Sequence, residues 1–175
     1  YASTLNPFMF LRDLFGFMVI VGIGIAIYRR IVMKVPRLKT NPMDTYAIII
    51  LAIIMLSGVF LEATKITSHT IYQEMVEEYA DTDDEEELRT LESFWVQNFD
   101  IVSPTVKGPF EEEILEQGSE MHDMSCAACH SRPGSAFTGY AVAKMIKPIA
   151  LGLDRANIPT LLWAIHFLAC FVGLA

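Results

Sequence analysis

The chain has 175 residues, a formal net charge of −8 and 53% apolar residues. Its length suits one domain, and its negative charge argues against nucleic acid as a partner, because nucleic acid attracts basic surfaces. The apolar content is only slightly above that of soluble domains, so its distribution must decide the class of protein. The chain begins at Tyr1 without an initiator Met or signal peptide and ends inside an apolar run at Ala175, so we expect part of a longer protein.

Three apolar segments divide the chain, at about residues 7–28, 44–61 and 158–175. A helix that crosses a bilayer needs roughly 20 mostly apolar residues, and all three segments fit that length. Buried helices of a soluble protein are the alternative, but three such segments in one short chain favour a membrane protein. The predicted fold is an all-α integral membrane helical bundle with three visible transmembrane helices.

The loop between the first two segments indicates how the helices are oriented. It contains no acidic residue and five basic ones, namely Arg29, Arg30, Lys34, Arg37 and Lys39. Short basic loops lie on the cytoplasmic side of a membrane. Residues 63–157 then lie outside the cytoplasm, and their 18 acids and 7 bases, a balance of −11, agree with that side. We therefore expect a multi-pass protein of the cytoplasmic (inner) membrane, with residues 63–157 in the periplasm if the cell is Gram-negative.

The connection 63–157 is too long to be a structureless loop and should contain helices. We expect a helix, a turn near Asp81–Asp84 and a second helix, followed by another helical stretch that leads into Cys126. In the second helix, apolar residues recur at helical spacing and should pack on a partner: Leu88, Leu91, Phe94, Trp95 and Phe99. The acidic run 83–87 suits a solvated helix start, and a docking patch for a basic cytochrome is the alternative. The predicted division is 1–62, 63–157 and 158–175.

The motif Cys126-Ala-Ala-Cys129-His130 is typical of covalent attachment of a c-type haem. The thiols add to the haem vinyl groups, and His130 binds the iron. Haem attachment takes place outside the cytoplasm, where the charge pattern independently puts this motif. Three alternatives stay open: a zinc site that includes His122, a thioredoxin-like redox pair and a structural disulfide.

The sixth ligand of this haem is expected to be a thioether or an imidazole. Met145 is the first candidate, and His122, Met124 and His69 follow. Each has a plainer interpretation, since Met usually packs in a core and His122 can be solvated.

Residues 110–135 resemble the start of class I cytochromes c, in which a helix ends in a Gly-led turn into the haem-binding motif. Gly118, Met121 and Pro133 carry this resemblance. Only about 25 residues separate Pro133 from the third apolar segment, so a complete domain of that class does not fit. We expect the connection, the membrane helices or another subunit to shelter the haem.

His166 lies in the middle of the third apolar segment, where a polar ring needs a partner. Its position is about 12 Å into the membrane from the outer side, at about 1.5 Å per helical residue. We expect it to bind the iron of a haem b, and a hydrogen bond to a neighbouring helix is the alternative. The other segments contain no second histidine, so that ligand must come from residues absent here or from another subunit. Cys170 is expected to pack.

Charged side chains lie at the outer ends of the first two apolar segments. Arg12 and Asp13 belong to the first and Glu62 follows the second. An ion pair that faces the bundle is the plain interpretation. The functional one is a site that binds a quinol head group and passes its protons.

Two helices together resemble a family of five-helix membrane cytochromes b that includes the nitrate reductase gamma subunit. The motifs are the Asp44-led apolar helix that ends in Ser57-Gly58 and the helix that contains Trp163 and His166. The family includes the membrane subunits of heterodisulfide-reductase-like and sulfite-reductase-linked complexes. The resemblance implies that His166 matches the outer of two haem-binding histidines on the fifth helix. The inner one would lie beyond Ala175, and the helix with their partners before Tyr1.

The long outer connection with its haem motif departs from the simple members of this family. The resulting hypothesis is a cytochrome subunit that transfers electrons between quinone or menaquinone and partner redox subunits, through haem b and haem c. It would be the quinol-oxidising or quinone-reducing membrane subunit of an oxidoreductase complex, and the family resemblance implies iron–sulfur or multihaem partners. The alternatives are a membrane sensor with an outer haem and a structural anchor for a soluble cytochrome.

Overall fold

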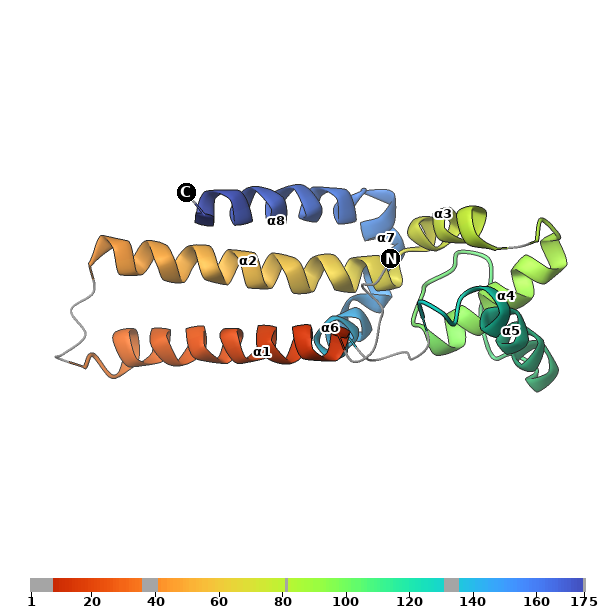
Figure 1. Cartoon of the computed structure of the whole chain (residues 1–175), viewed down its shortest axis with the longest axis horizontal. Coiled ribbons are helices and arrows are strands. Elements are labelled where there is room, and N and C mark those ends of the chain that lie inside the picture. Colours follow the sequence, from red (N-terminus) through yellow and green to blue (C-terminus); the bar gives the residue numbers. More distant parts are fainter. Residues whose placement is uncertain (1–7, 36–40, 81, 131–135, 175) are drawn as a thin grey trace.

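The computed structural model describes residues 8–35, 41–80, 82–130 and 136–174. Helices are the only regular secondary structure in these ranges, which confirms the all-α prediction. Three long helices run side by side, and a group of shorter helices caps one end of them (Figure 1).

Helices α1 (Phe8–Ile27) and α2 (Pro42–Thr67) form an antiparallel hairpin. A π-helical turn, Tyr28–Val32, extends α1, and the two helices are long and apolar enough to cross a membrane. The Asn41 side chain accepts a hydrogen bond from the Asp44 N–H and so caps the start of α2, where Pro42 occupies the first turn. The helix continues past its expected end at Leu61 to Thr67. Its last turns therefore reach the group of shorter helices at the end of the bundle, which we call the outer part.

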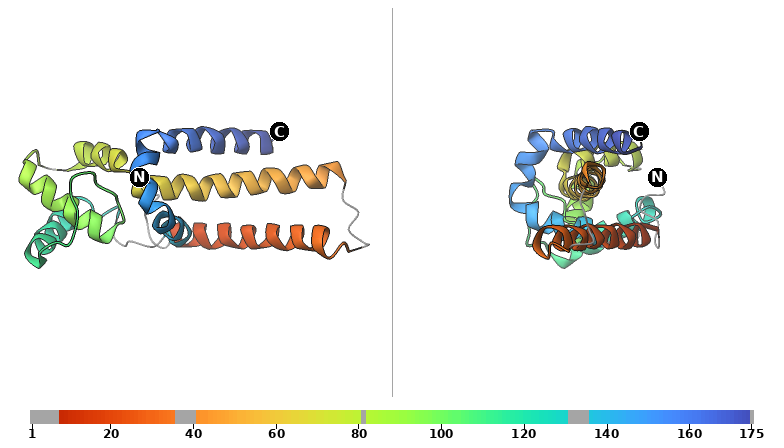
Figure 2. Two further views of the ribbon diagram at one scale, coloured as in Figure 1. Left: turned by 180° about the vertical axis from the view of Figure 1, so that it is seen from behind. Right: turned by 90° about the vertical axis from the view of Figure 1, so that its left-hand side faces the viewer.

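The third membrane segment is helix α8 (Ile158–Leu174), which begins where the sequence predicts. It follows α6 (Phe137–Ile146), a 3₁₀ turn (Lys147–Ile149) and α7 (Ala150–Arg155). The chain bends by 96° between this run and α8, at Asn157, whose φ of 53° suits an Asn. The described structure therefore contains two candidate membrane spans, or three if the bent pair counts as one. Helix α2 is central, with α1 and α8 on different sides of it (Figure 2).

Asp81 of the predicted turn lies outside the described residues, and the outer part contains the two predicted helices on either side of it. They are α3 (His69–Tyr79) and α4 (Glu85–Asn98), and α5 (Glu112–Ser125) leads into Cys126. Ser68 caps α3, and the Asp84 side chain accepts from two N–H groups at the start of α4. A small apolar core joins these helices, formed by Tyr72, Leu91, Trp95, Phe99, Ile101 and Cys126.

Helix α5 crosses α4 at Gly118, one of the residues behind the resemblance to cytochrome c. A Cβ atom at this position would lie 2.7 Å from the Cβ of Phe94 and 2.8 Å from the Thr90 carbonyl oxygen. No side chain fits in that space, so the two helix backbones approach as closely as they do because the residue is glycine.

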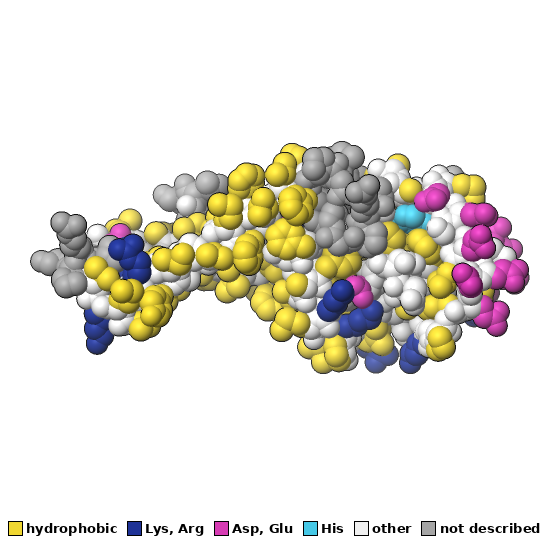
Figure 3. Space-filling view, turned by 90° about the horizontal axis from the view of Figure 1, so that it is seen from below, with side chains coloured by type: hydrophobic (Ala, Val, Ile, Leu, Met, Phe, Trp, Pro, Cys, Tyr) yellow, Lys and Arg dark blue, Asp and Glu magenta, His cyan; other side chains and the backbone are white. Residues whose placement is uncertain are grey.

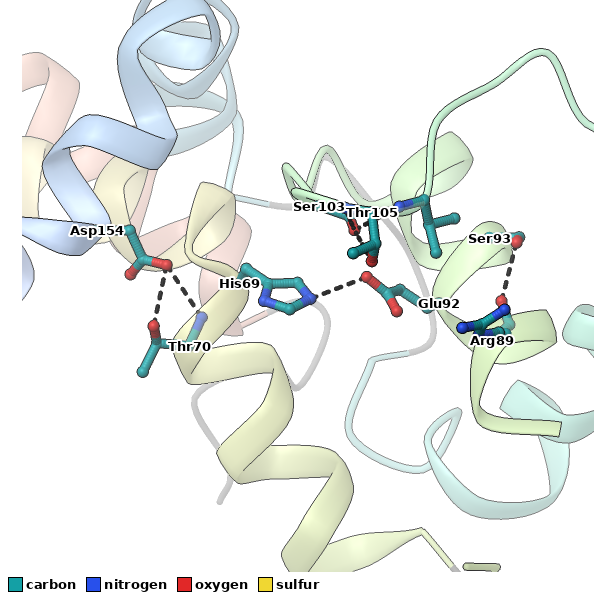
Figure 4. A network of polar contacts seen from close by, with 9 residues as sticks. His69, Thr70, Arg89, Glu92, Ser93, Ser103, Thr105 and Asp154 are labelled. Carbon is teal, nitrogen blue, oxygen red and sulfur yellow. Dashed lines mark hydrogen bonds and ion pairs between the residues drawn. The ribbon is translucent and has the colours of Figure 1, made fainter. Parts of the chain in front are cut away.

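Polar contacts fix the outer part to the end of the bundle (Figure 4). Asp154 of α7 accepts hydrogen bonds from the Thr70 N–H at 3.1 Å, from its hydroxyl at 3.0 Å and from the Ser68 hydroxyl. His69 Nε2 lies 2.9 Å from Glu92 Oε1 and ties α3 to α4. Asp154 of α7 and Glu92 of α4 thus fix the orientation of α3.

Acidic side chains are concentrated at one end of the molecule. On the face in Figure 3, acidic side chains gather at the end that the outer helices form, whereas basic side chains lie at the opposite end and also near the middle of the molecule. Apolar side chains cover the helices between these ends, and many are large and exposed, such as Phe10, Phe15 and Met18 of α1. A belt of this kind suits the hydrocarbon layer of a bilayer.

Candidate functional site

One cavity of about 660 Å³ runs along α2 from the membrane helices into the outer part. Its lining includes His166 of α8, Glu62 of α2 and His130, which follows α5. The volume lies within the range of about 300–1,000 Å³ that is usual for ligand pockets. Two residues predicted from separate motifs to bind iron therefore face one space.

The imidazole of His166 is held by helix α2. Its Nδ1 lies 3.1 Å from the Ile54 carbonyl oxygen and 3.0 Å from the Ser57 hydroxyl. A carbonyl can only accept, so Nδ1 carries the proton and donates to it. This contact gives the polar ring a partner inside the membrane, as expected if His166 is hydrogen-bonded to a neighbouring helix. It also leaves the Nε2 lone pair available for iron, which is the arrangement seen when the second nitrogen of a metal-binding histidine donates to a carbonyl.

Gly58 lets this ring lie against the backbone of α2. A Cβ atom on Gly58 would lie 3.1 Å from Cε1 of His166 and 3.5 Å from its Nδ1. Nε2 of His166 lies 3.7 Å from the Cys170 sulfur, one turn along the same helix, which is within hydrogen-bond distance for a thiol. The structure thus brings together the two motifs, Ser57-Gly58 and His166, that carried the family resemblance.

The charged residues at the outer ends of α1 and α2 form one cluster. The Arg12 guanidinium pairs with Glu62 and, at 2.9 Å, with Asp13. The second carboxylate oxygen of Asp13 accepts from the Thr138 N–H at 2.9 Å and from its hydroxyl at 2.7 Å. Asp13 is only 4% exposed and has both oxygens occupied, so it holds the first turn of α6 against α1. The predicted ion pair is present.

Glu62 lies beneath the start of α6. A Cβ atom at Gly139 would meet its Cγ at 2.6 Å, so the α6 backbone covers this side chain directly. Glu62 and Arg12 both line the cavity. A carboxylate and a guanidinium in a largely apolar cavity can hold a polar head group, and the carboxylate can exchange a proton with it.

The Cys126–His130 motif forms a compact turn at the end of α5. The N–H of His130 donates to the Cys126 carbonyl at 2.9 Å, and the Cys129 N–H donates to the same oxygen at 3.1 Å. Cys126 is buried, Cys129 is half-buried and both are free thiols. Burial raises the pKa of the Cys126 thiol, because it disfavours the thiolate. Pro133 lies outside the described residues.

His130 lines the outer end of the cavity between aromatic rings. Its ring centroid is 5.0 Å from that of Trp95, edge to face, and 6.5 Å from that of Phe99. Burial lowers the pKa of His130, so the imidazole is neutral at pH 7 and has a lone pair for a metal. Two free thiols and a neutral imidazole beside an aromatic cavity fit a covalently bound haem. Within the described residues, no group of three or more His, Cys, Asp or Glu side chains could hold a metal ion, so the zinc alternative lacks support there.

His122 supports the motif from behind. Its Nε2 donates to the His130 carbonyl at 3.1 Å, and its ring packs on Phe94 and Phe99 with centroids 5.2 and 5.0 Å away. It is 4% exposed and is not among the cavity-lining residues, which favours a role in positioning His130.

The proposed thioether ligands differ in their access to this cavity. Met145 is 78% exposed and Met124 is 80% exposed, and neither lines the cavity. Met75 of α3 does line it and packs against the core that contains Cys126. The sequence singled out Met145 by its position after the haem motif. Helices α4 and α5 separate Met75 from the motif in the sequence, and Met75 comes close to it only because α3 packs against α4.

The comparisons with known proteins concern mainly the membrane hairpin. Residues 6–82 match the family of the nitrate reductase gamma subunit, a range that includes α1, α2 and α3. None of the curated proteins and none of the solved structures matches the chain. The matched family consists of haem b-binding membrane cytochromes that are subunits of redox complexes. With its apolar helices, the chain is accordingly a multi-pass membrane protein, and its residues 6–82 are similar to the nitrate reductase gamma-subunit family of membrane cytochromes.

Proposed function

We propose that this protein is a cytochrome subunit that transfers electrons between the quinone or menaquinone pool and partner redox subunits, through a haem b and a covalent haem c. The observation that carries the proposal is the shared cavity. Its lining includes His166 in the membrane, the Arg12–Glu62 pair at the membrane edge and His130 of the haem c motif. Groups suited to hold two redox centres and a quinone therefore border one continuous space.

His166 would bind the iron of haem b through Nε2. The bond from Nδ1 to the Ile54 carbonyl orients the ring, and Gly58 leaves room for it. A haem held there supplies one-electron redox chemistry, and the surrounding helices exclude water from it.

Cys126 and Cys129 would attach haem c, and His130 would bind its iron. The compact turn from Cys126 to His130, the neutral imidazole and the aromatic wall support this role. His122 would keep the turn in place through its bond to the His130 carbonyl.

Arg12 and Glu62 would bind the quinone head group. Oxidation of one quinol releases two electrons and two protons, and reduction of a quinone takes up the same number. Arg12 can donate a hydrogen bond to a quinone oxygen, and the Glu62 carboxylate can take or give one of the protons. Asp13 would act indirectly, since both its oxygens are engaged by Arg12 and Thr138.

The outer part would lie on the periplasmic side and the basic loop in the cytoplasm. The basic residues Arg29 and Arg30 in the turn that extends α1 support this orientation, because positively charged loops stay inside. The partner would be an iron–sulfur or multihaem subunit. The exposed acidic start of α4, from Asp84 to Glu87, offers negative charge to a basic partner.

A reduced pyridine-haem spectrum, combined with haem staining of the denatured band, tests the proposal. We expect separate b- and c-type absorption and a stained band. Cys126→Ala with Cys129→Ala should abolish the stain and keep haem b, whereas His166→Ala should lose haem b and keep the stain. Leu168→Ala is the control, because Leu168 lies on the same helix as His166, is exposed and does not line the cavity; it should change neither.

Two outcomes would count against the proposal. An unstained band of the unmodified protein refutes covalent haem c. Haem c without haem b leaves His166 as a packed histidine and favours the sensor or the anchor.

A further inference from the structure

The helical run before α8 has an exposed side that plays no part in the function proposed so far. The run consists of α6, the 3₁₀ turn Lys147–Ile149 and α7, and it lies outside the family match at residues 6–82. Its α6 contacts α1 and α2, and its α7 contacts α8. In the right-hand view of Figure 2, the run crosses the end of the bundle from α1 towards α8.

The bend before α8 sets how the run lies relative to a membrane. The chain bends by 96° between the run and α8, and α8 packs beside α2, which is long and apolar enough to span a bilayer. Spanning helices are tilted by only about 20° from the bilayer normal on average. The run therefore lies close to the plane of the bilayer surface, at the end of the bundle that carries the outer part.

One face of the run is buried on the bundle. Gly139 lies against Glu62, and Ala143 and Ala150 are almost completely buried. Thr138 lines the cavity. This face thus covers the cavity, and its small residues let the run approach α2 closely.

The opposite face carries a stripe of uncovered apolar side chains. Met145 is 78% exposed and Ile149 is 59% exposed, and Ala141 is exposed one turn before Met145. Positions 141, 145 and 149 are four residues apart and follow one another along one side of a helical run. A continuous apolar surface of this kind marks a place of contact with protein or membrane.

The stripe is continuous with the apolar belt of the membrane helices. Phe137, the first residue of α6, packs its ring on those of Phe10 and Phe17 of α1, with centroids 5.8 and 6.3 Å away. Both of these α1 rings are themselves exposed members of the belt. The run thus begins at the edge of the hydrocarbon layer, which makes lipid the partner that the stripe meets.

Basic side chains flank the stripe. Lys144 and Arg155 are exposed, and neither forms an ion pair with another of the described residues. Lys147, between them, pairs with Asp100. An apolar side bordered by basic residues is typical of a helix that lies in the membrane surface, with its apolar side about 5–10 Å into the boundary between head groups and acyl chains.

We propose that α6 and α7 lie in the bilayer surface and bind anionic phospholipid. Met145 and Ile149 insert among the acyl chains, and Lys144 and Arg155 contact the lipid phosphates. Charge complementarity and the continuity of the stripe with the apolar belt support this partner. The inference needs neither haem nor quinone, so its test is independent of the proposed function.

The test of the apolar stripe uses the full chain in vesicles that contain brominated phospholipid, whose bromines quench nearby tryptophan fluorescence. Met145→Trp and Ile149→Trp, each in a Trp163→Phe background, place a reporter on the stripe. We expect brominated lipid to quench both, most strongly when the bromines lie near the head-group end of the acyl chains. Tyr79→Trp in the same background is the matched control, because Tyr79 is 60% exposed at the end of α3 in the outer part. It should be quenched little, and Trp95 contributes equally to all three variants.

The test of the basic residues compares two lipids. In vesicles of phosphatidylglycerol and phosphatidylcholine, with either lipid brominated in turn, we expect Met145→Trp to report more phosphatidylglycerol than the bulk contains. Adding Lys144→Gln or Arg155→Gln should reduce this preference about fivefold, which corresponds to the roughly 1 kcal/mol that one basic residue contributes at an anionic surface. Arg89→Gln is the control, since Arg89 is exposed on α4 in the outer part, and it should leave the preference unchanged.

Two results would overturn the proposal. If Met145→Trp and Ile149→Trp are quenched no more than Tyr79→Trp, protein rather than lipid covers the stripe. If both lipids quench equally, or if neither glutamine variant changes the preference, the run does not bind anionic phospholipid through Lys144 and Arg155.

Discussion

The close crossing of α4 and α5 at Gly118 allows a quantitative prediction about the stability of the outer part. In Gly118→Ala, the new methyl group would start 2.7 Å from the Cβ of Phe94 and 2.8 Å from the Thr90 oxygen. Carbon atoms prefer separations of about 3.5–4.0 Å, so the helices must part by nearly 1 Å. A shorter side chain at position 94 would not relieve the clash, because one contact is the Cβ of Phe94 and the other is the backbone oxygen of Thr90.

The magnitude follows from two opposing effects. Forcing a methyl group into a packed interface costs about 1–3 kcal/mol. Replacing a helical glycine by alanine contributes about 0.5–1 kcal/mol in the other direction. We therefore expect Gly118→Ala to lower the free energy of unfolding of the outer part by about 1–2 kcal/mol.

Urea unfolding in detergent, followed by tryptophan fluorescence, measures this change. The chain has two tryptophans, so a Trp163→Phe background leaves Trp95 of the outer core as the only reporter. Gly152→Ala in α7 is the control, since a Cβ atom there meets nothing within 4 Å. A Gly118→Ala protein as stable as the unmodified one would refute the close packing that the structure describes.

Three further predictions concern the cavity and its supports. If Met75 is the sixth ligand of haem c, Met75→Leu should change the visible spectrum of the oxidised haem and Met145→Leu should not; the reverse result would restore Met145. Burial lowers the pKa of His122 below its ordinary 6.5. As pH falls through 6.5, the unfolded chain therefore binds more protons than the folded one, and the free energy of unfolding should decrease. In His122→Phe, urea midpoints at pH 7 and pH 5 should therefore differ less than in the unmodified chain; an equal difference would contradict this role. Thr138→Val removes a hydroxyl donor to Asp13 and should lower the free energy of unfolding by about 1.5–3 kcal/mol, which thermal unfolding would show as a lower melting temperature. An unchanged melting temperature would show that α6 docks by other contacts.

The helical elements could be predicted because their signals are local. The apolar runs, the acidic start of α4 and its periodic residues each depend on neighbours within a few turns. The helices α6 and α7 were not predicted as separate elements. Their surroundings are mixed in polarity, and their packing on α2 comes from contacts with residues distant in sequence, such as Glu62 with Gly139.

The chemistry of the candidate site divides in the same way. The sequence by itself predicts haem attachment at Cys126, Cys129 and His130 from the spacing of these residues, and it singles out His166 because a polar ring is costly in a membrane. Those are properties of residue type and neighbourhood.

Only the tertiary structure decided which residues share a space. It placed His166 and His130 on one cavity, engaged both oxygens of Asp13 and left Met145 and Ile149 exposed. The reason is physical: a cavity wall collects side chains from helices far apart in the chain, and whether a side chain is covered depends on every helix around it. No local pattern contains that information.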